Sequence, residues 1–254
     1  MRTKEKVAVL FAALILLLPI AASAFTGPIS LTDPNWTVST RVTTNGSEIT
    51  KTSSPATQTA ILLSFPFANA DSGATGSAYT SFLLDKISLS LSSSNTITAT
   101  FDVPATLATL ATFVGNPNGN ACGPSTSVRL FFQSTGTGNP GSITGPAPNN
   151  GGFETKFWWS NTGTVATTVA SGSHYNFVNG GTGGTITLSV PLNGADWSDF
   201  YGHFGTGSYG ANFNAALGAI SFIGLSFGSG CFFANGVGVT GGSATFELTS
   251  YTIS

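Results

Sequence analysis

The chain has 254 residues, of which 41% are hydrophobic, 11% are aromatic and only 7% are charged. Disordered chains combine low hydrophobicity with high net charge, so this composition predicts a folded protein. Lys and Arg do not cluster anywhere after the first six residues. This excludes a basic surface for nucleic acid or for anionic lipid.

Residues 1–24 have the three-part pattern of a secretory signal peptide. Arg2, Lys4 and Lys6 precede an apolar stretch over 7–20, and Ala22-Ser23-Ala24 supplies the small residues of a cleavage site. The apolar stretch is shorter than the roughly 20 residues that span a bilayer as a helix. We therefore expect cleavage after Ala24, a secreted, extracellular or periplasmic protein, and no membrane insertion of the remaining chain.

Residues 25–254 are expected to form a single domain, since 230 residues (254 − 24) suit one all-β domain. This part carries five basic and nine acidic residues, a net charge of −4 (5 − 9). Its two cysteines are Cys122 and Cys231, and an even pair in an exported protein predicts one disulfide. Two separate buried thiols are the alternative. Neither cysteine has a second Cys or a His at ligand spacing, which disfavours metal binding.

Strand patterns recur along the chain, beginning with an apolar run at 60–65. Residues 82–91 alternate with period two, a polar turn follows, and 96–103 resumes the alternation. Two such runs joined by a short turn predict an antiparallel hairpin. Further strands are expected at 128–132, 153–159, 185–190, 220–227 and 244–253.

The segments between the strands are rich in Gly, Asn, Pro and Ser, and the longest loops are expected at 115–126, 136–152 and 178–184. Helical patterns are short. One turn is expected at 195–200 and another at 212–218, with Asn212 or Asn214 as its N-cap. Many short strands without a full helix predict an all-β, antiparallel β-sandwich with long loops and at most one or two short helical turns.

The C-terminal third has a characteristic order of motifs. A strand over 185–192 ends in Pro-Leu, Trp197-Ser198-Asp199-Phe200 forms a turn, and strands at 217–227 and 242–253 follow. This order resembles the end of galactose-binding-like jelly rolls, which include many carbohydrate-binding modules of secreted bacterial proteins. The resemblance covers about 70 residues. It implies a jelly-roll sandwich and carbohydrate as a ligand class.

The resemblance also implies a structural calcium site in many members of the family, and Asp33 and Glu247 are the acids placed to attempt one. A hard cation needs six to eight oxygens, usually from several carboxylates. Asp33 is better explained as a turn residue before Pro34, and Glu247 as a solvent-facing residue of an alternating strand. We therefore predict no metal and no other cofactor.

Catalytic constellations are weak. Asp196 and Asp199 are the closest acids, and a helical turn would place them on one face. Acids favoured at a helix start by the macrodipole explain them better. His174 and His203 lack the Gly-x-Ser-x-Gly context of a nucleophile elbow. We expect a protein that is not an enzyme.

Aromatic residues are the class that exceeds expectation. Trp158 and Trp159 must point to opposite faces of a regular strand, so one is expected in the core and the other at a surface, groove or loop. Aromatic rings stack on the apolar faces of sugars beside amide and hydroxyl groups. The predicted ligand contacts are Trp158, Trp159, His174, Tyr175 and Asn176. Other prominent aromatic residues are Trp36, Trp197, Phe200, Tyr201 and Tyr209.

These patterns predict a secreted, non-catalytic domain that binds a carbohydrate or another cell-surface polymer. A structural or adhesive extracellular protein, such as a matrix or surface-layer subunit, is the first alternative. A polysaccharide-active enzyme that uses Asp196 or Asp199 is the second. Exposure of one tryptophan of the pair on a concave face would favour binding, whereas burial of both under a flat surface would favour a structural role.

Overall fold

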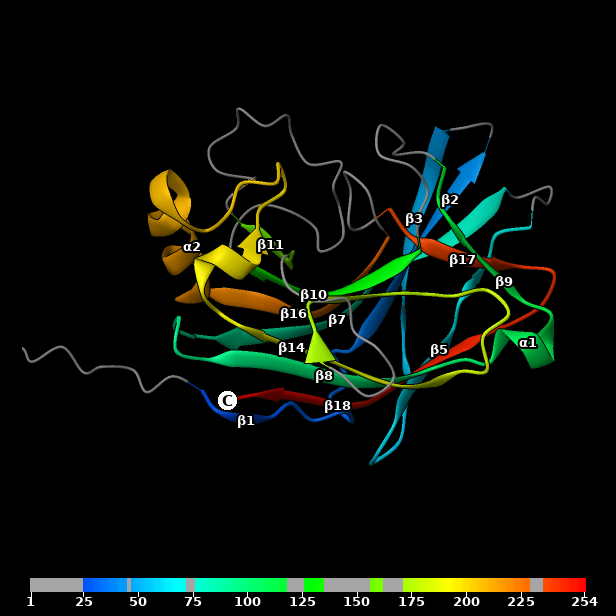
Figure 1. Cartoon of the computed structure of the whole chain (residues 1–254), viewed down its shortest axis with the longest axis horizontal. Helices are drawn as coiled ribbons and strands as arrows, with labels where there is room; N and C mark the ends of the chain where they lie inside the picture. Colours follow the sequence, from blue (N-terminus) through cyan, green and yellow to red (C-terminus); the bar gives the residue numbers. More distant parts are fainter. Residues whose placement is uncertain are drawn as a thin grey trace, which may run out of the picture.

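The computed structural model describes residues 25–44, 47–71, 76–117, 126–134, 156–161, 171–228 and 235–254. Its strands form two mainly antiparallel sheets that pack face to face (Figure 1). The predicted all-β sandwich is therefore confirmed. The expected signal peptide at 1–24 lies outside the described residues, as do both cysteines of the expected disulfide, Cys122 and Cys231.

The first sheet is built around β18, which pairs with β8 on one side and with β5 on the other. β1 also pairs with β18, at the C-terminal end of that strand. The described strands of this sheet are β4 (Thr57–Gln58), β5 (Leu63–Pro66), β18 (Thr245–Ile253), β8 (Thr96–Val103), β14 (Gly184–Pro191), β12 (Ser171–Gly172) and β1 (Gly27–Pro28).

The second sheet is built around β7, which is 13 residues long and pairs with β16 and with β2. Its main path runs through β15 (Trp197–Ser198), β11 (Phe157–Ser160), β10 (Ser127–Ser134), β16 (Ile220–Phe227), β7 (Ser77–Leu89), β17 (Val237–Thr240) and β6 (Ala68–Asn69). Its side branches are β2 (Thr37–Thr44), β3 (Ser47–Pro55), β9 (Thr112–Gly115) and β13 (His174–Asn176).

The order of the central strands is that of a jelly roll. In the first sheet the order is β5, β18, β8, β14, and in the second it is β7, β16, β10, β11. Strands from the end of the chain thus lie beside strands from its beginning, and the chain passes repeatedly between the sheets. This is the double-sheet winding that covers most strand edges in jelly rolls.

The predicted hairpin between 82–91 and 96–103 is wrong, because β7 and β8 lie in different sheets. Both strands bury apolar residues in the same core between the sheets, including Leu83 from β7 and Phe101 from β8. The connection crosses the edge of the sandwich, where Leu91 N donates to Leu217 O and Ser92 N donates to Asn95 Oδ1. Periodicity identified both strands but carried no information on their partners.

The helical segments also differ in detail from expectation. The turn expected at 195–200 is a 3-10 turn at Gly194–Asp196 that passes directly into β15. α2 spans Gly210–Leu217, follows a 3-10 turn at Gly207–Tyr209, and has Tyr209 at its N-cap without a side-chain cap. Asn212 and Asn214 therefore lie inside the helix and do not cap it. A further turn of helix, α1, spans Thr106–Thr109.

The buried residues form two clusters. The main core lies between the sheets and includes Trp36, Phe101, Trp158, Phe227 and Phe246. A second cluster lies on the opposite face of the second sheet, because its residues alternate with core residues along β7, β10 and β11. It consists of Phe82, Leu84, Phe131, Phe157 and Trp159, with Phe200 packed against it. The second sheet is thus apolar on both faces in this region.

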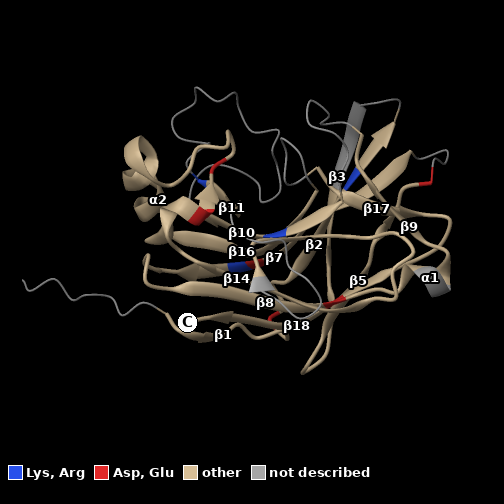
Figure 2. Ribbon diagram, in the orientation of Figure 1, with Lys and Arg blue, Asp and Glu red and all other residues tan. Residues whose placement is uncertain are grey.

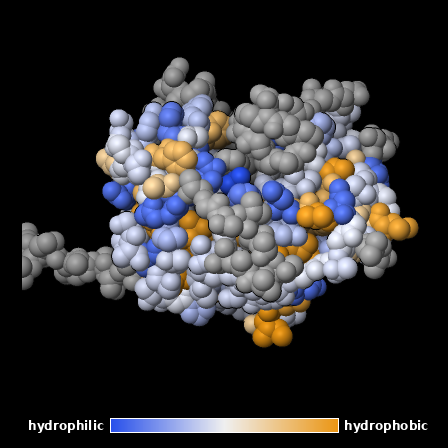
Figure 3. Space-filling model, viewed as in Figure 1, coloured by the Kyte–Doolittle hydropathy of each residue, from blue (hydrophilic) through white to orange (hydrophobic). Residues whose placement is uncertain are grey.

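Charged residues are few and dispersed over the part of the chain that the structure describes (Figure 2). The space-filling view is mostly pale, with separate apolar spots (Figure 3). The most exposed large apolar side chains of the described residues are Leu110 (80%), Ile61 (79%) and Val178 (60%). No helix among these residues is long and apolar enough to span a membrane.

Leu110 ends α1 in the left-handed conformation, with φ of 55°. A side chain with a Cβ pays about 1–2 kcal/mol in this region, where glycine does not. We expect Leu110→Gly to raise the free energy of unfolding by about 1 kcal/mol in urea titrations. Leu110→Ala keeps the Cβ and should leave stability nearly unchanged, so equal effects of the two substitutions would contradict the explanation.

Candidate functional site

Trp158 and Trp159 lie on opposite faces of β11, as alternation predicts. Trp158 belongs to the main core and is fully buried, and Trp159 belongs to the second cluster and is only 2% exposed. Neither ring of the pair is therefore exposed at a surface or groove, and Trp159 instead faces its cluster and Phe200 of the loop after β15. The second sheet carries an apolar cluster on its outer face as well, and Trp159 packs there against Phe131 with ring centroids 5.3 Å apart.

The other predicted contact residues, His174, Tyr175 and Asn176, form β13 beside β10. Tyr175 packs against the main core, and burial raises the pKa of its phenol. Burial, and then the positive charge of Arg129, lower the pKa of His174 to about 4, so its ring is neutral at physiological pH. Asn176 is exposed. These residues do not join the two tryptophans in one accessible site.

The aromatic residues that do reach the surface lie in a tight loop after β15. Asp199 N donates to His203 O, Gly202 N donates to Asp199 O, and Gly205 N donates to Trp197 O. The Asp199 side chain folds back as well, since its Oδ1 accepts from Tyr201 N at 2.9 Å. Such an Asx turn is a local preference of Asp. Gly202 has φ of 82° and allows the reversal.

We call four aromatic side chains of the segment 201–209 the aromatic platform: Tyr201, His203, Phe204 and Tyr209. Tyr201 and Phe204 are each 40% exposed. The imidazole of His203 stacks on the ring of Tyr209, with ring centroids 4.0 Å apart and an angle of 9° between the planes. The ring centroid of Tyr201 lies 6.1 Å from that of His203. The platform lies next to α2 (Figure 1).

The platform is fixed to the fold from beneath. Trp197, just before the loop, is fully buried in the main core, and its indole donates to Pro191 O at 2.8 Å. Phe200 packs against the second cluster, 6.3 Å from the ring of Trp159. Gly205 lies so close to Phe213 of α2 that a Cβ there would be 2.6 Å from the ring. The exposed rings are therefore held by a rigid, packed base.

A buried carboxylate organises the loop. The Asp199 side chain is fully buried, and its Oδ2 lies 3.0 Å from His203 Nδ1. Its Oδ1 also accepts from His203 N at 2.8 Å. Asp196, which was paired with Asp199 in the sequence, accepts a hydrogen bond from the Asn193 side chain and lies in the preceding 3-10 turn. The two acids do not share one face of a helix as expected.

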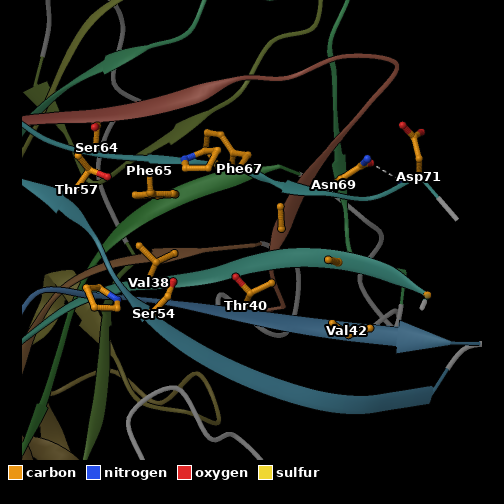
Figure 4. A pocket seen from close by; sticks show the side chains of 15 residues that line it. Val38, Thr40, Val42, Ser54, Thr57, Ser64, Phe65, Phe67, Asn69 and Asp71 are labelled. Atoms are coloured by element: carbon orange, nitrogen blue, oxygen red, sulfur yellow. Dashed lines mark hydrogen bonds between the residues drawn. The ribbon is translucent and has the colours of Figure 1, made fainter. Parts of the chain in front are cut away.

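A cleft of about 580 Å³ opens where the two sheets diverge. Figure 4 shows Val38 and Thr40 of β2 on one wall, opposite Phe65 and Phe67. Both phenylalanines are more than nine-tenths buried, so the cleft presents mainly hydroxyl and small side chains. At one end Asp71 accepts from Gly241 N. The cleft lacks an exposed ring on which a sugar could stack.

Asp33 and Glu247, the two acids considered for a calcium site, each have a structural explanation. Asp33 Oδ1 accepts from Asn35 N at 2.9 Å, which makes Asp33 a turn residue before Pro34. Glu247 lies on β18, half-buried, between buried Phe246 and Leu248. Within the described residues, no group of three or more His, Cys, Asp or Glu could hold a metal ion.

No protein-family model, no curated protein and no solved structure matches the chain. These comparisons do not bear on the resemblance of the C-terminal third to carbohydrate-binding jelly rolls, which stays a prediction. Two of its most distinctive residues, Leu192 and Trp197, are fully buried. The order of motifs therefore reflects core packing. Tyr201 and Phe204, which lie shortly after Trp197, are the exposed rings of this region, and neither is among the predicted ligand contacts.

Proposed function

We propose that the protein is a secreted, non-catalytic domain that binds carbohydrate or another cell-surface polymer through the aromatic platform. The observation that carries this proposal is the pair Tyr201 and Phe204, each 40% exposed on a loop that is packed from beneath. Exposed aromatic rings at fixed positions suit stacking on sugar rings, because little conformational freedom is lost on binding. The signal pattern at 1–24 supports secretion.

The enzyme alternative is weaker because Asp199 is engaged. Its side chain is fully buried and accepts from two backbone N–H groups and from the His203 ring. A general acid or base must reach the substrate within hydrogen-bond distance. Among the described residues, the one hydroxyl in hydrogen-bond range of the imidazole belongs to Tyr209.

The expected result is that the double variant Tyr201→Ala/Phe204→Ala binds at least about fivefold more weakly than the wild type, since each stacking contact contributes about 0.5–1.5 kcal/mol. Affinity electrophoresis in gels containing soluble polysaccharides, with pull-down on insoluble ones, measures this. Ile61→Ala is the matched control, because it removes an exposed apolar side chain from another loop. Unchanged binding in the double variant would refute the platform.

A structural or adhesive role is the second candidate. Burial of both Trp158 and Trp159 is the outcome expected for it, and Leu110, Ile61 and Val178 are exposed apolar side chains that contacts between copies could cover. Sedimentation at increasing concentration tests this role. A monomer at all concentrations would leave the binding function as the better proposal.

A further inference from the structure

We propose that His203 determines the specificity of the platform: its Nε2 accepts a hydrogen bond from a hydroxyl of a neutral sugar, and Asp199 is the positioning residue that fixes the ring. This inference rests on the proposed function and adds the chemistry of the ligand. Three features of the loop support this role: the tautomer of the imidazole, the direction of the Nε2 lone pair and the charged residues of the loop.

The tautomer follows from the environment of Asp199. An ionised carboxylate only accepts hydrogen bonds. Its Oδ1 is already occupied by the N–H groups of Tyr201 and His203, and its Oδ2 lies 3.0 Å from His203 Nδ1. A neutral imidazole at this position therefore carries its ring proton on Nδ1. In the neutral imidazole this leaves Nε2 with a lone pair that can accept.

The lone pair on Nε2 is available to a ligand. The Tyr209 hydroxyl lies 3.2 Å from Nε2, but the two rings are parallel within 9° with centroids 4.0 Å apart. The phenol oxygen thus lies over the face of the imidazole, whereas the lone pair points along the ring plane. Tyr209 supports the imidazole by stacking. The His203 side chain is 41% exposed, so part of the imidazole is open to a ligand.

The charged residues within the loop favour a neutral ligand. Lys156 is the last basic residue, and the 98 residues that follow it (254 − 156) contain three acids and no Lys or Arg. Two of those acids, Asp196 and Asp199, directly precede the platform in sequence. Residues 193–209 contain no Lys or Arg that could pair with a uronic acid, sulfate or phosphate group, and these two acids are their only charged residues apart from His203. The stacked rings and one acceptor fit a neutral sugar that donates a hydroxyl proton.

The test uses residues 25–254 and five soluble probes: galactomannan, xyloglucan and β-glucan as neutral polymers, and polygalacturonate and alginate as anionic ones. We expect retention by at least one neutral polymer and none by the anionic ones. His203→Phe keeps a planar ring on Tyr209 but removes Nε2, and should weaken binding up to about tenfold, the range of one hydrogen bond. Stronger retention by an anionic polymer would overturn the assignment of a neutral ligand.

Asp199→Asn provides an independent readout. The amide N–H can donate to Nδ1 and so stabilise the opposite tautomer. We expect ¹⁵N NMR of the neutral imidazole to show the proton on Nδ1 in the wild type and on Nε2 in Asp199→Asn. A wild-type proton on Nε2 would overturn the inference.

The binding results separate the inference from the function on which it rests. If His203→Phe binds as tightly as the wild type while Tyr201→Ala/Phe204→Ala does not, the role of His203 is refuted and the platform stands. If the wild type binds only an anionic polymer, the neutral-ligand inference fails and the platform stands, whereas binding to none of the five polymers counts against both the proposed function and the inference. Circular dichroism and thermal unfolding of each variant distinguish lost contacts from lost structure.

Discussion

Replacing Trp158 by Ala is expected to lower the free energy of unfolding by about 3–5 kcal/mol, the range for removal of a large buried aromatic side chain. The ring is fully buried between the sheets. It lies edge-on to Phe213 with centroids 4.9 Å apart and stacks on Phe132 at 6.5 Å. Truncation leaves a cavity lined by rings on β10 and α2, and these packed elements cannot collapse to fill it. Urea unfolding followed by circular dichroism measures the change.

The matched control is Tyr201→Ala, an aromatic truncation at a site that is 40% exposed. We expect its effect on stability to stay within about 0.5 kcal/mol, as for surface substitutions in general. The two variants should therefore differ in kind: Trp158→Ala loses stability, whereas Tyr201→Ala keeps its stability and loses binding. A small stability change in Trp158→Ala would show that the ring does not fill the core as described.

The second large effect concerns Asp85, a carboxylic acid on β7 inside the sandwich. Its side chain is fully buried, pairs in register with Ile223 of the core, and neither oxygen has a hydrogen-bond partner. Burial, and then the negative charge of Asp33, raise the pKa of Asp85 from 3.8 to about 7. Removing an ionised group from water without a partner disfavours the charged form strongly.

The direction of the pH dependence follows from proton binding. Between pH 3.8 and about 7 the folded protein keeps the Asp85 proton while the unfolded chain releases it. Stability is therefore highest below this window, falls as the pH rises through it, and levels off above about 7. The free energy of unfolding changes across this window by at most about 4 kcal/mol, because each pKa unit between the folded and unfolded states corresponds to about 1.4 kcal/mol.

We accordingly expect Asp85→Asn to be more stable than the wild type at pH 8, by roughly 2–4 kcal/mol, and similar to it near pH 4. Urea titrations from pH 4 to 8 test this. The control is Asp102→Asn, which removes a half-buried carboxylate from β8 of the other sheet and leaves the fully buried Asp85 in place. If the free energy of unfolding of the wild type and of Asp85→Asn changed in the same way between pH 4 and pH 8, the explanation would be contradicted.

Local periodicity was sufficient to identify most strands. β8 and β16 begin and end at the predicted residues, and β7, β10, β14 and β18 differ by a few residues at their ends. The long pair β2 and β3 was overlooked, although alternating Thr and Val around Asn45-Gly46 is a strong hairpin signal. Whether a segment forms a strand depends on its local alternation and on the turn residues beside it, so strands can be predicted from a single sequence.

Strand partners were not determined in the same way. A period-two strand has one apolar face whether it joins its neighbour in a hairpin or crosses to the opposite sheet. Leu83 of β7 and Phe101 of β8 belong to the same core but come from opposite sheets, and only the packing of the whole sandwich could decide that. The predicted hairpin failed for this reason.

The site shows the same division. The sequence alone determined that the chain is an all-β sandwich with sparse charge and a surplus of aromatic rings, and that Trp158 and Trp159 point to opposite faces. Tertiary structure alone decided which rings are exposed. The second sheet has an apolar cluster on its outer face that buries Trp159, and the turn held by Asp199 carries Tyr201 and Phe204 outward. Burial depends on what lies across a face, and residues distant in sequence supply it.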